Sequence, residues 1–161
     1  MGEVMKTPTQ RLADLGYSLP DPPSPVAAYV PAVESEGLVL VSGQIPLHQG
    51  ELICTGSVPS AASAEDATKA ARQCALNALS VLDSVAPGGL DSVERILRLG
   101  IFVCSDAGFY GQPAVANGAS ELLEAVFGES GRHARAAVGV IALPLGATVE
   151  VELTARLSPA G

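Results

Sequence analysis

Charged residues are scarce in this chain, and acidic residues outnumber basic ones. Only 16% of the 161 residues are charged, with 17 Asp and Glu against nine Lys and Arg, for a net charge of −8. Nucleic-acid-binding proteins concentrate Lys and Arg on one face, so we expect no nucleic-acid partner. Apolar residues make up 48% of the chain, which is rich for a soluble monomer of one domain. We therefore expect part of this apolar surface to lie in a subunit interface.

Long apolar runs and clusters of potential metal ligands are also missing. No run reaches the roughly 18 residues of a membrane span, and residues 1–20 lack the apolar core of a signal peptide, which predicts a cytoplasmic protein without a membrane partner. Cys54, Cys74 and Cys104 form no CxxC pair and are interpreted as reduced core thiols. His48 and His133 have no partner at ligand spacing and are interpreted as surface residues. We expect no metal and no cofactor.

The order of predicted elements favours an α/β (α+β) fold. Prolines forbid a long helix in the first 25 residues, which we expect to form an extended arm, either docked or disordered. Hydrophobic periodicity predicts strands at 27–33, 38–42, 93–104, 135–143 and 148–157, a short strand near 52–54, and helices from Ser63 to the glycines near 88 and over 114–127. The order is ββαββαββ or close to it, giving a mixed sheet with both helices on one face. A second subunit is the simplest cover for the other face.

Two charged residues in predicted strands are candidates for binding. Arg135 lies among apolar residues, so its guanidinium should be paired or face a cleft, and its planar fork fits a carboxylate. Glu150 shares one strand face with Glu152, which alone is typical of a solvated face.

The string Val41 to Pro46, Val-Ser-Gly-Gln-Ile-Pro, resembles the signature of the RidA/YjgF/UK family of reactive-intermediate deaminases. Further matches follow in order through 71–73, Asn77, 102–103, 134–135 and 143–144 to 149–152. The resemblance implies a family domain over 25–161, preceded by an arm over 1–24. It also implies a chorismate-mutase-like subunit, assembled as a homotrimer with ligand clefts at the subunit boundaries.

The resemblance also implies roles for individual residues. Arg135 matches the arginine that takes the substrate carboxylate, and Glu150 matches the glutamate associated with the attacking water. Tyr29 and Gly43 match further cleft residues, and Asn117 matches an asparagine of the second helix if a gap of about one helical turn is allowed. The chain departs from many members at Ala137, where they carry Cys or Ser. The string from 131 to 135 resembles a subgroup whose activity is not established.

Two functions follow from this resemblance. The first is hydrolysis of enamines or imines, such as 2-aminoacrylate and 2-iminopropanoate, to a 2-oxo acid and ammonia. The second is a trimeric module that binds small carboxylate metabolites without turnover, which Ala137 favours slightly. The sequence leaves open whether the protein is an enzyme.

Overall fold

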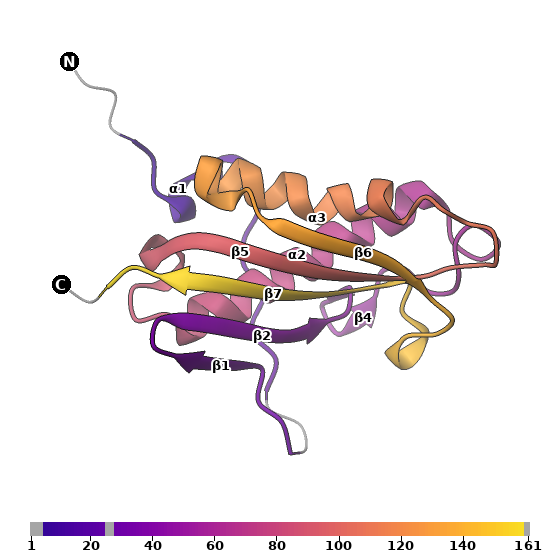
Figure 1. Cartoon of the computed structure of the whole chain (residues 1–161), viewed down its shortest axis with the longest axis horizontal. Helices are drawn as coiled ribbons and strands as arrows, with labels where there is room; N and C mark the ends of the chain where they lie inside the picture. Colours follow the sequence, from indigo (N-terminus) through magenta and orange to yellow (C-terminus); the bar gives the residue numbers. More distant parts are fainter. Residues whose placement is uncertain (1–4, 25–27, 160–161) are drawn as a thin grey trace.

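The computed structural model describes residues 5–24 and 28–159 and contains one mixed five-stranded sheet. The sheet has the order β1-β2-β7-β5-β6, and among the neighbouring strands of the described residues only the pair of β5 and β6 is parallel (Figure 1). The strands are β1 (Ala32–Ser35), β2 (Leu38–Gln44), β5 (Val93–Cys104), β6 (Ala134–Val140) and β7 (Val149–Leu157). The predicted mixed sheet is confirmed, and β5 has the bounds predicted for the strand over 93–104. It is a single strand between the helices, where the predicted order ββαββαββ had two.

Two helices, α2 (Ala64–Val85) and α3 (Gln112–Phe127), pack side by side and cover one sheet face (Figure 1). Alternate residues of β7, from Val149 to Leu157, are buried beneath them, as period-2 alternation requires. The helices approach closely because α3 has Gly118 against the Thr68 carbonyl, where a Cβ would clash. The arrangement of both helices on one face agrees with the prediction.

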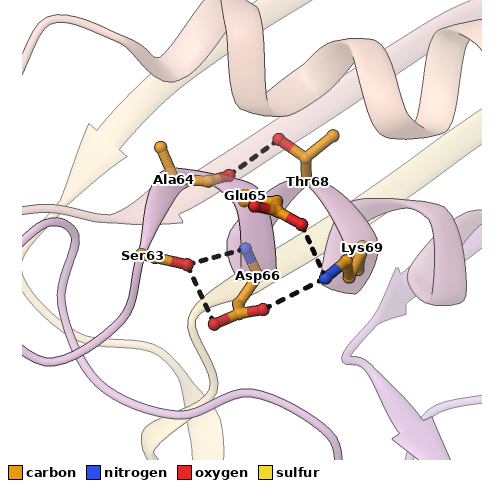
Figure 2. Close-up of polar contacts among 6 residues, drawn as sticks. All are labelled: Ser63, Ala64, Glu65, Asp66, Thr68 and Lys69. Carbon is orange, nitrogen blue, oxygen red and sulfur yellow. Dashed lines mark hydrogen bonds and ion pairs between the residues drawn. The ribbon is translucent and has the colours of Figure 1, made fainter.

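The start of α2 was predicted correctly from Ser63 and the acidic residues after it. The Ser63 hydroxyl accepts a hydrogen bond from the Asp66 backbone N–H at 3.0 Å and donates to the Asp66 carboxylate at 2.8 Å. Lys69 forms ion pairs with Glu65 and Asp66 one turn later (Figure 2). This N-cap satisfies a backbone donor that the first helical turn leaves free, and the carboxylates favour the positive end of the helix dipole.

The segment after β2 forms a second small hairpin where the sequence predicted a loop with one short strand near 52–54. Its strands are β3 (Leu47–His48) and β4 (Glu51–Leu52), joined by two residues with positive φ, as in a tight hairpin turn. The Asn77 side chain on α2 donates hydrogen bonds to the carbonyls of Ile45 and Leu47 at 2.9 and 3.0 Å. These contacts hold the chain that leaves β2 against α2.

The N-terminal arm is docked on its own subunit, and the prediction that it is extended throughout was wrong. A short helix, α1 (Pro8–Asp14), begins at Thr7, whose side chain caps the Gln10 N–H. Pro8 fits there because the first helical position needs no N–H donor and proline supplies the required φ. Leu12 is buried, and residues 16–24 continue without regular structure.

Candidate functional site

The sheet register places Arg135 and Glu150 on opposite faces of the sheet. Arg135 lies beside Leu99 in the parallel pair of β6 and β5, and Leu99 is fully buried under the helices. Glu150 lies beside Phe102 in the antiparallel pair of β7 and β5. Residues 99 and 102 have opposite parity, so their side chains point to opposite faces. One subunit therefore holds two separate clusters of the candidate residues.

The first cluster lies around Glu150, at the edge of a broad cleft of about 1330 Å³. Tyr29 and Gly43 both line this cleft, as does the segment of the arm from Gly16 to Ser24. Gly43 lies against the Glu150 side chain so closely that a Cβ at this position would overlap the carboxylate. Among the described lining residues there is no Lys or Arg. The cleft therefore offers a carboxylate without a cation beside it.

Burial and a neighbouring charge both act on the pKa of the Glu150 carboxyl. Burial raises the pKa of the Glu150 carboxyl above its usual value, and the nearby negative charge of Glu152 raises the pKa further. The folded protein therefore binds this proton more tightly than the unfolded chain does. Stability falls as the pH rises from the ordinary glutamate pKa through the raised one, because the folded state then loses a proton that it favours.

The second cluster lies between β6 and α3, around the guanidinium of Arg135. Nη1 of Arg135 donates to Asn117 Oδ1 at 2.9 Å and to Ser120 Oγ at 3.1 Å, and Nη2 donates to the Pro113 carbonyl at 3.2 Å. A guanidinium has five N–H groups, so the N–H of Nε and one of Nη2 have no protein acceptor in the described part of the chain. No carboxylate of the described residues pairs with Arg135.

The prediction for Arg135 assumed that apolar neighbours in sequence make the residue buried, and this was only partly correct. Its neighbours in sequence are apolar, yet β6 is an edge strand and the residue is exposed. Its hydrogen-bond acceptors in the described residues are all neutral. The structure does bring Asn117 to Arg135, although the sequence match for this residue needed a gap. Ala137 lies two residues further along the same strand face and is half-buried.

Sequence reasoning missed two residues beside Arg135. His133, interpreted as a surface residue, is half-buried and contacts Ser120 and the Gly131 carbonyl. His133 and Arg135 are two residues apart in sequence, and Asn117 and Ser120 are three apart on a helix, so each pair shares a face. The spacing within each pair can be read from the sequence. The antiparallel packing of α3 against β6, which brings the two pairs together, cannot.

The other candidate groups have simpler surroundings. Cys54, Cys74 and Cys104 are buried and unpaired, and burial raises the pKa of the Cys74 thiol well above its usual value. His48 is exposed on β3 and lines the Glu150 cleft. Within residues 5–24 and 28–159, no three His, Cys, Asp or Glu side chains lie close enough to hold a metal ion. The helices of the same ranges include none long and apolar enough to cross a membrane.

Comparison with known proteins decides the family. The model of the family described as endoribonuclease L-PSP matches residues 20–157. The chain belongs to this family. The expected resemblance to RidA and YjgF is thereby confirmed, because the YjgF proteins are members and have the same fold.

Individual proteins match this chain over nearly their whole length. Protein TCP17 of Trypanosoma cruzi is 43% identical over 148 residues, which are 91% of this chain and 92% of TCP17. The crystal structure of Atu1372 from Agrobacterium tumefaciens is 40% identical, with a TM-score of 0.85 over 92% of this chain and 90% of that one. A candidate endoribonuclease from Shewanella oneidensis MR-1 is 31% identical, with a TM-score of 0.90 over 94% and 100%.

Proposed function

We propose that this protein hydrolyses small enamines and imines of the 2-aminoacrylate and 2-iminopropanoate type to 2-oxo acids and ammonia, at clefts between its subunits. The observation that carries the proposal is Arg135, whose guanidinium is fixed by three neutral acceptors and keeps two N–H groups free. Two adjacent donors on one planar cation are what a carboxylate accepts in a bidentate pair. Family membership agrees with this chemistry, since imine deaminases belong to the family.

The separation of the two clusters supports a site shared between subunits. Arg135 and Glu150 point to opposite sheet faces, so one chain cannot bring both to the same small ligand. In the described part of the chain no helix covers the sheet face that carries Glu150, and this face has exposed apolar side chains such as Leu40 and Val138. In the proposed homotrimer, this face packs on a neighbouring subunit, and the neighbour's Arg135 cluster meets the Glu150 cleft.

The proposed roles follow from the two environments. Arg135 holds the substrate carboxylate and thereby fixes the imine carbon near Glu150. Glu150, whose pKa is raised by burial and by Glu152, takes a proton from water as the water attacks the imine carbon. With a protonated imine this addition leaves a hydroxyl and a neutral amino group on the carbon, and the proton on Glu150 then goes to the amino nitrogen. The carbon–nitrogen bond breaks as the hydroxyl gives its proton back to Glu150, so ammonia and the 2-oxo acid leave. An enamine enters the same sequence after its methylene carbon takes up a proton. No redox step and no cofactor enter this balance.

Ala137 favours a second function, the binding of 2-oxo acids or similar carboxylates without turnover. Its methyl group lies on the same strand face as Arg135 and cannot hold a water, where many family members have Cys or Ser. Hydrolysis survives this loss only if Glu150 alone positions the water. The free donors of Arg135 serve both functions equally, so binding by itself does not separate them.

The test is a coupled assay in which an amino-acid oxidase generates 2-iminopropanoate from alanine. We expect the purified protein to accelerate pyruvate release beyond a buffer blank, and the Glu150→Gln variant to fail to do so. Saturable pyruvate binding without acceleration supports the binding module instead. If there is neither acceleration nor binding, both functions are wrong.

A further inference from the structure

Ser120 and His133 form a hydrogen-bonded chain that ends on the guanidinium of Arg135. Ser120 Oγ lies 3.1 Å from Arg135 Nη1 and 2.9 Å from His133 Nε2. His133 Nδ1 lies 2.6 Å from the Gly131 carbonyl oxygen. Ser120 and His133 are half-buried, whereas Arg135 is exposed. The chain thus runs from half-buried groups to the exposed guanidinium of Arg135.

For a neutral imidazole, the chemistry of the groups sets the direction of every hydrogen bond in the chain. The Gly131 carbonyl can only accept, so Nδ1 of His133 carries a hydrogen and donates. In the neutral imidazole Nε2 is then the acceptor, and it takes the single hydrogen of the Ser120 hydroxyl. The lone pairs of Ser120 Oγ are left for the Arg135 N–H. Each donor therefore has one acceptor, and of the two neutral tautomers of His133 the chain takes the Nδ1–H form.

The far end of this hydrogen-bonded chain, at Gly131, is held by contacts with α3 and β5. Gly131 packs against the Leu123 carbonyl near the end of α3, where a Cβ would overlap the backbone. Arg95 on β5 donates through Nη2 to the Arg132 carbonyl at 3.1 Å, which holds the backbone directly before His133. The Arg132 side chain forms ion pairs with Glu124 and Glu129. These contacts hold the Gly131 carbonyl, and with it the His133 ring, in place.

We infer that Ser120 and His133 are positioning residues for Arg135, and that they set the orientation of its free N–H groups for a ligand carboxylate. This inference rests on the proposed function, since it takes Arg135 as the carboxylate-binding group. Both hydrogens of Nη1 are used by Asn117 and Ser120. Without the Ser120 acceptor the guanidinium gains freedom to turn about its last bonds, and a bidentate pair then costs more entropy to form.

The test measures the dissociation constant of pyruvate by calorimetry for a small set of variants in the assembled protein. We expect Ser120→Ala to weaken binding about three- to tenfold, the size of one ordinary net hydrogen bond, because the lost contact acts on the ligand only through Arg135. Ser120→Thr keeps the hydroxyl and should restore most of the affinity. His133→Gln retains an acceptor near Nε2 and should bind nearly as the parent does, whereas His133→Ala should resemble Ser120→Ala. Because the two residues act as one unit, the double alanine variant should be no weaker than the weaker single variant.

The control variant is Ser84→Ala on α2, which also removes a serine hydroxyl from a helix. The Ser84 hydroxyl donates to the Val81 carbonyl at 2.7 Å, and Ser84 lines neither cluster, so pyruvate binding should not change. Nitrogen-15 NMR adds a readout that a merely structural role does not move. It should show the Nδ1–H form of His133 at neutral pH, and slow rotation of the Arg135 guanidinium that becomes fast in Ser120→Ala.

Two outcomes overturn the inference while leaving the proposed function intact. One is parental pyruvate binding by Ser120→Ala while Arg135→Lys is weakened, and the other is a hydrogen on Nε2 of His133 at neutral pH. If Arg135→Lys also binds pyruvate as the parent does, the proposed carboxylate site itself is wrong, and the inference fails with it.

Discussion

Replacement of Arg135 by lysine keeps the positive charge and removes the fork, so it tests the proposed carboxylate site directly. The guanidinium makes three hydrogen bonds to Asn117, Ser120 and the Pro113 carbonyl and keeps two N–H groups free. A lysine ammonium has three N–H groups in total. It can therefore donate to the three protein acceptors or to the two oxygens of the ligand carboxylate, but not to all five.

The magnitude follows from this shortage of donors. Arg135→Lys loses at least one arm of a bidentate, charge-assisted pair, which costs on the order of 1–3 kcal/mol. That range corresponds to roughly five- to 150-fold weaker binding. We expect calorimetric titration with pyruvate and 2-oxobutanoate to show this loss for both ligands alike, because the carboxylate is the part that they share.

The matched control is Arg132→Lys, three residues earlier, whose guanidinium pairs with Glu124 and Glu129 at the surface. Exposed ion pairs of this kind contribute little, so binding should stay within error of the parent. The reasoning is refuted if Arg135→Lys binds both 2-oxo acids as tightly as the parent while light scattering shows an unchanged assembly. Arg135 is then a structural residue of an edge strand.

Three further predictions concern Glu150 and the assembly. Glu150→Gln should abolish the acceleration of pyruvate release. It should also raise the melting temperature above that of the parent at pH 7 and not at pH 4, because it removes a carboxylate whose burial and neighbour Glu152 disfavour its charge. If variant and parent melt at the same temperature at both pH values, the pKa argument is wrong. Gly43→Ala should lower turnover by displacing the Glu150 side chain, whereas its matched control Gly100→Ala, which meets Glu152 instead, should not. Light scattering should give three times the subunit mass of 16.3 kDa; a monomer excludes a site shared between subunits.

Much of the fold follows from short-range patterns that the sequence displays. The alternation from Val149 to Leu157 specified both the strand and its buried face, and Ser63 with the acidic residues after it specified the first turn of α2. Such signals depend on residues that are close in sequence. The helix at Pro8–Asp14 was missed because the prolines were taken as breakers, although proline is well suited to the first helical position.

The candidate site was less accessible to sequence reasoning, because its clusters depend on long-range register. Arg135 and Glu150 are fifteen residues apart, and nothing local in the sequence shows that β5 lies between their strands in the sheet. The parallel pairing of β6 with β5 and the antiparallel pairing of β7 with β5 set their opposite faces. Ser120 and His133 were missed for the same reason, since their contact exists only where α3 crosses the start of β6.

The two clusters are complementary in charge, and this bears on which ligands they can share. Arg135 is a cation with neutral acceptors, and Glu150 is a half-buried acid in a cleft whose described lining includes no Lys or Arg. A ligand with a carboxylate at one end and a protonated imine nitrogen at the other offers each cluster the charge that it lacks. A 2-oxo acid offers only the carboxylate, so in the proposed shared site it should bind through Arg135 and leave Glu150 unpaired. Loss of the nitrogen on hydrolysis therefore weakens the hold of the site on its own product, which is the direction that turnover requires.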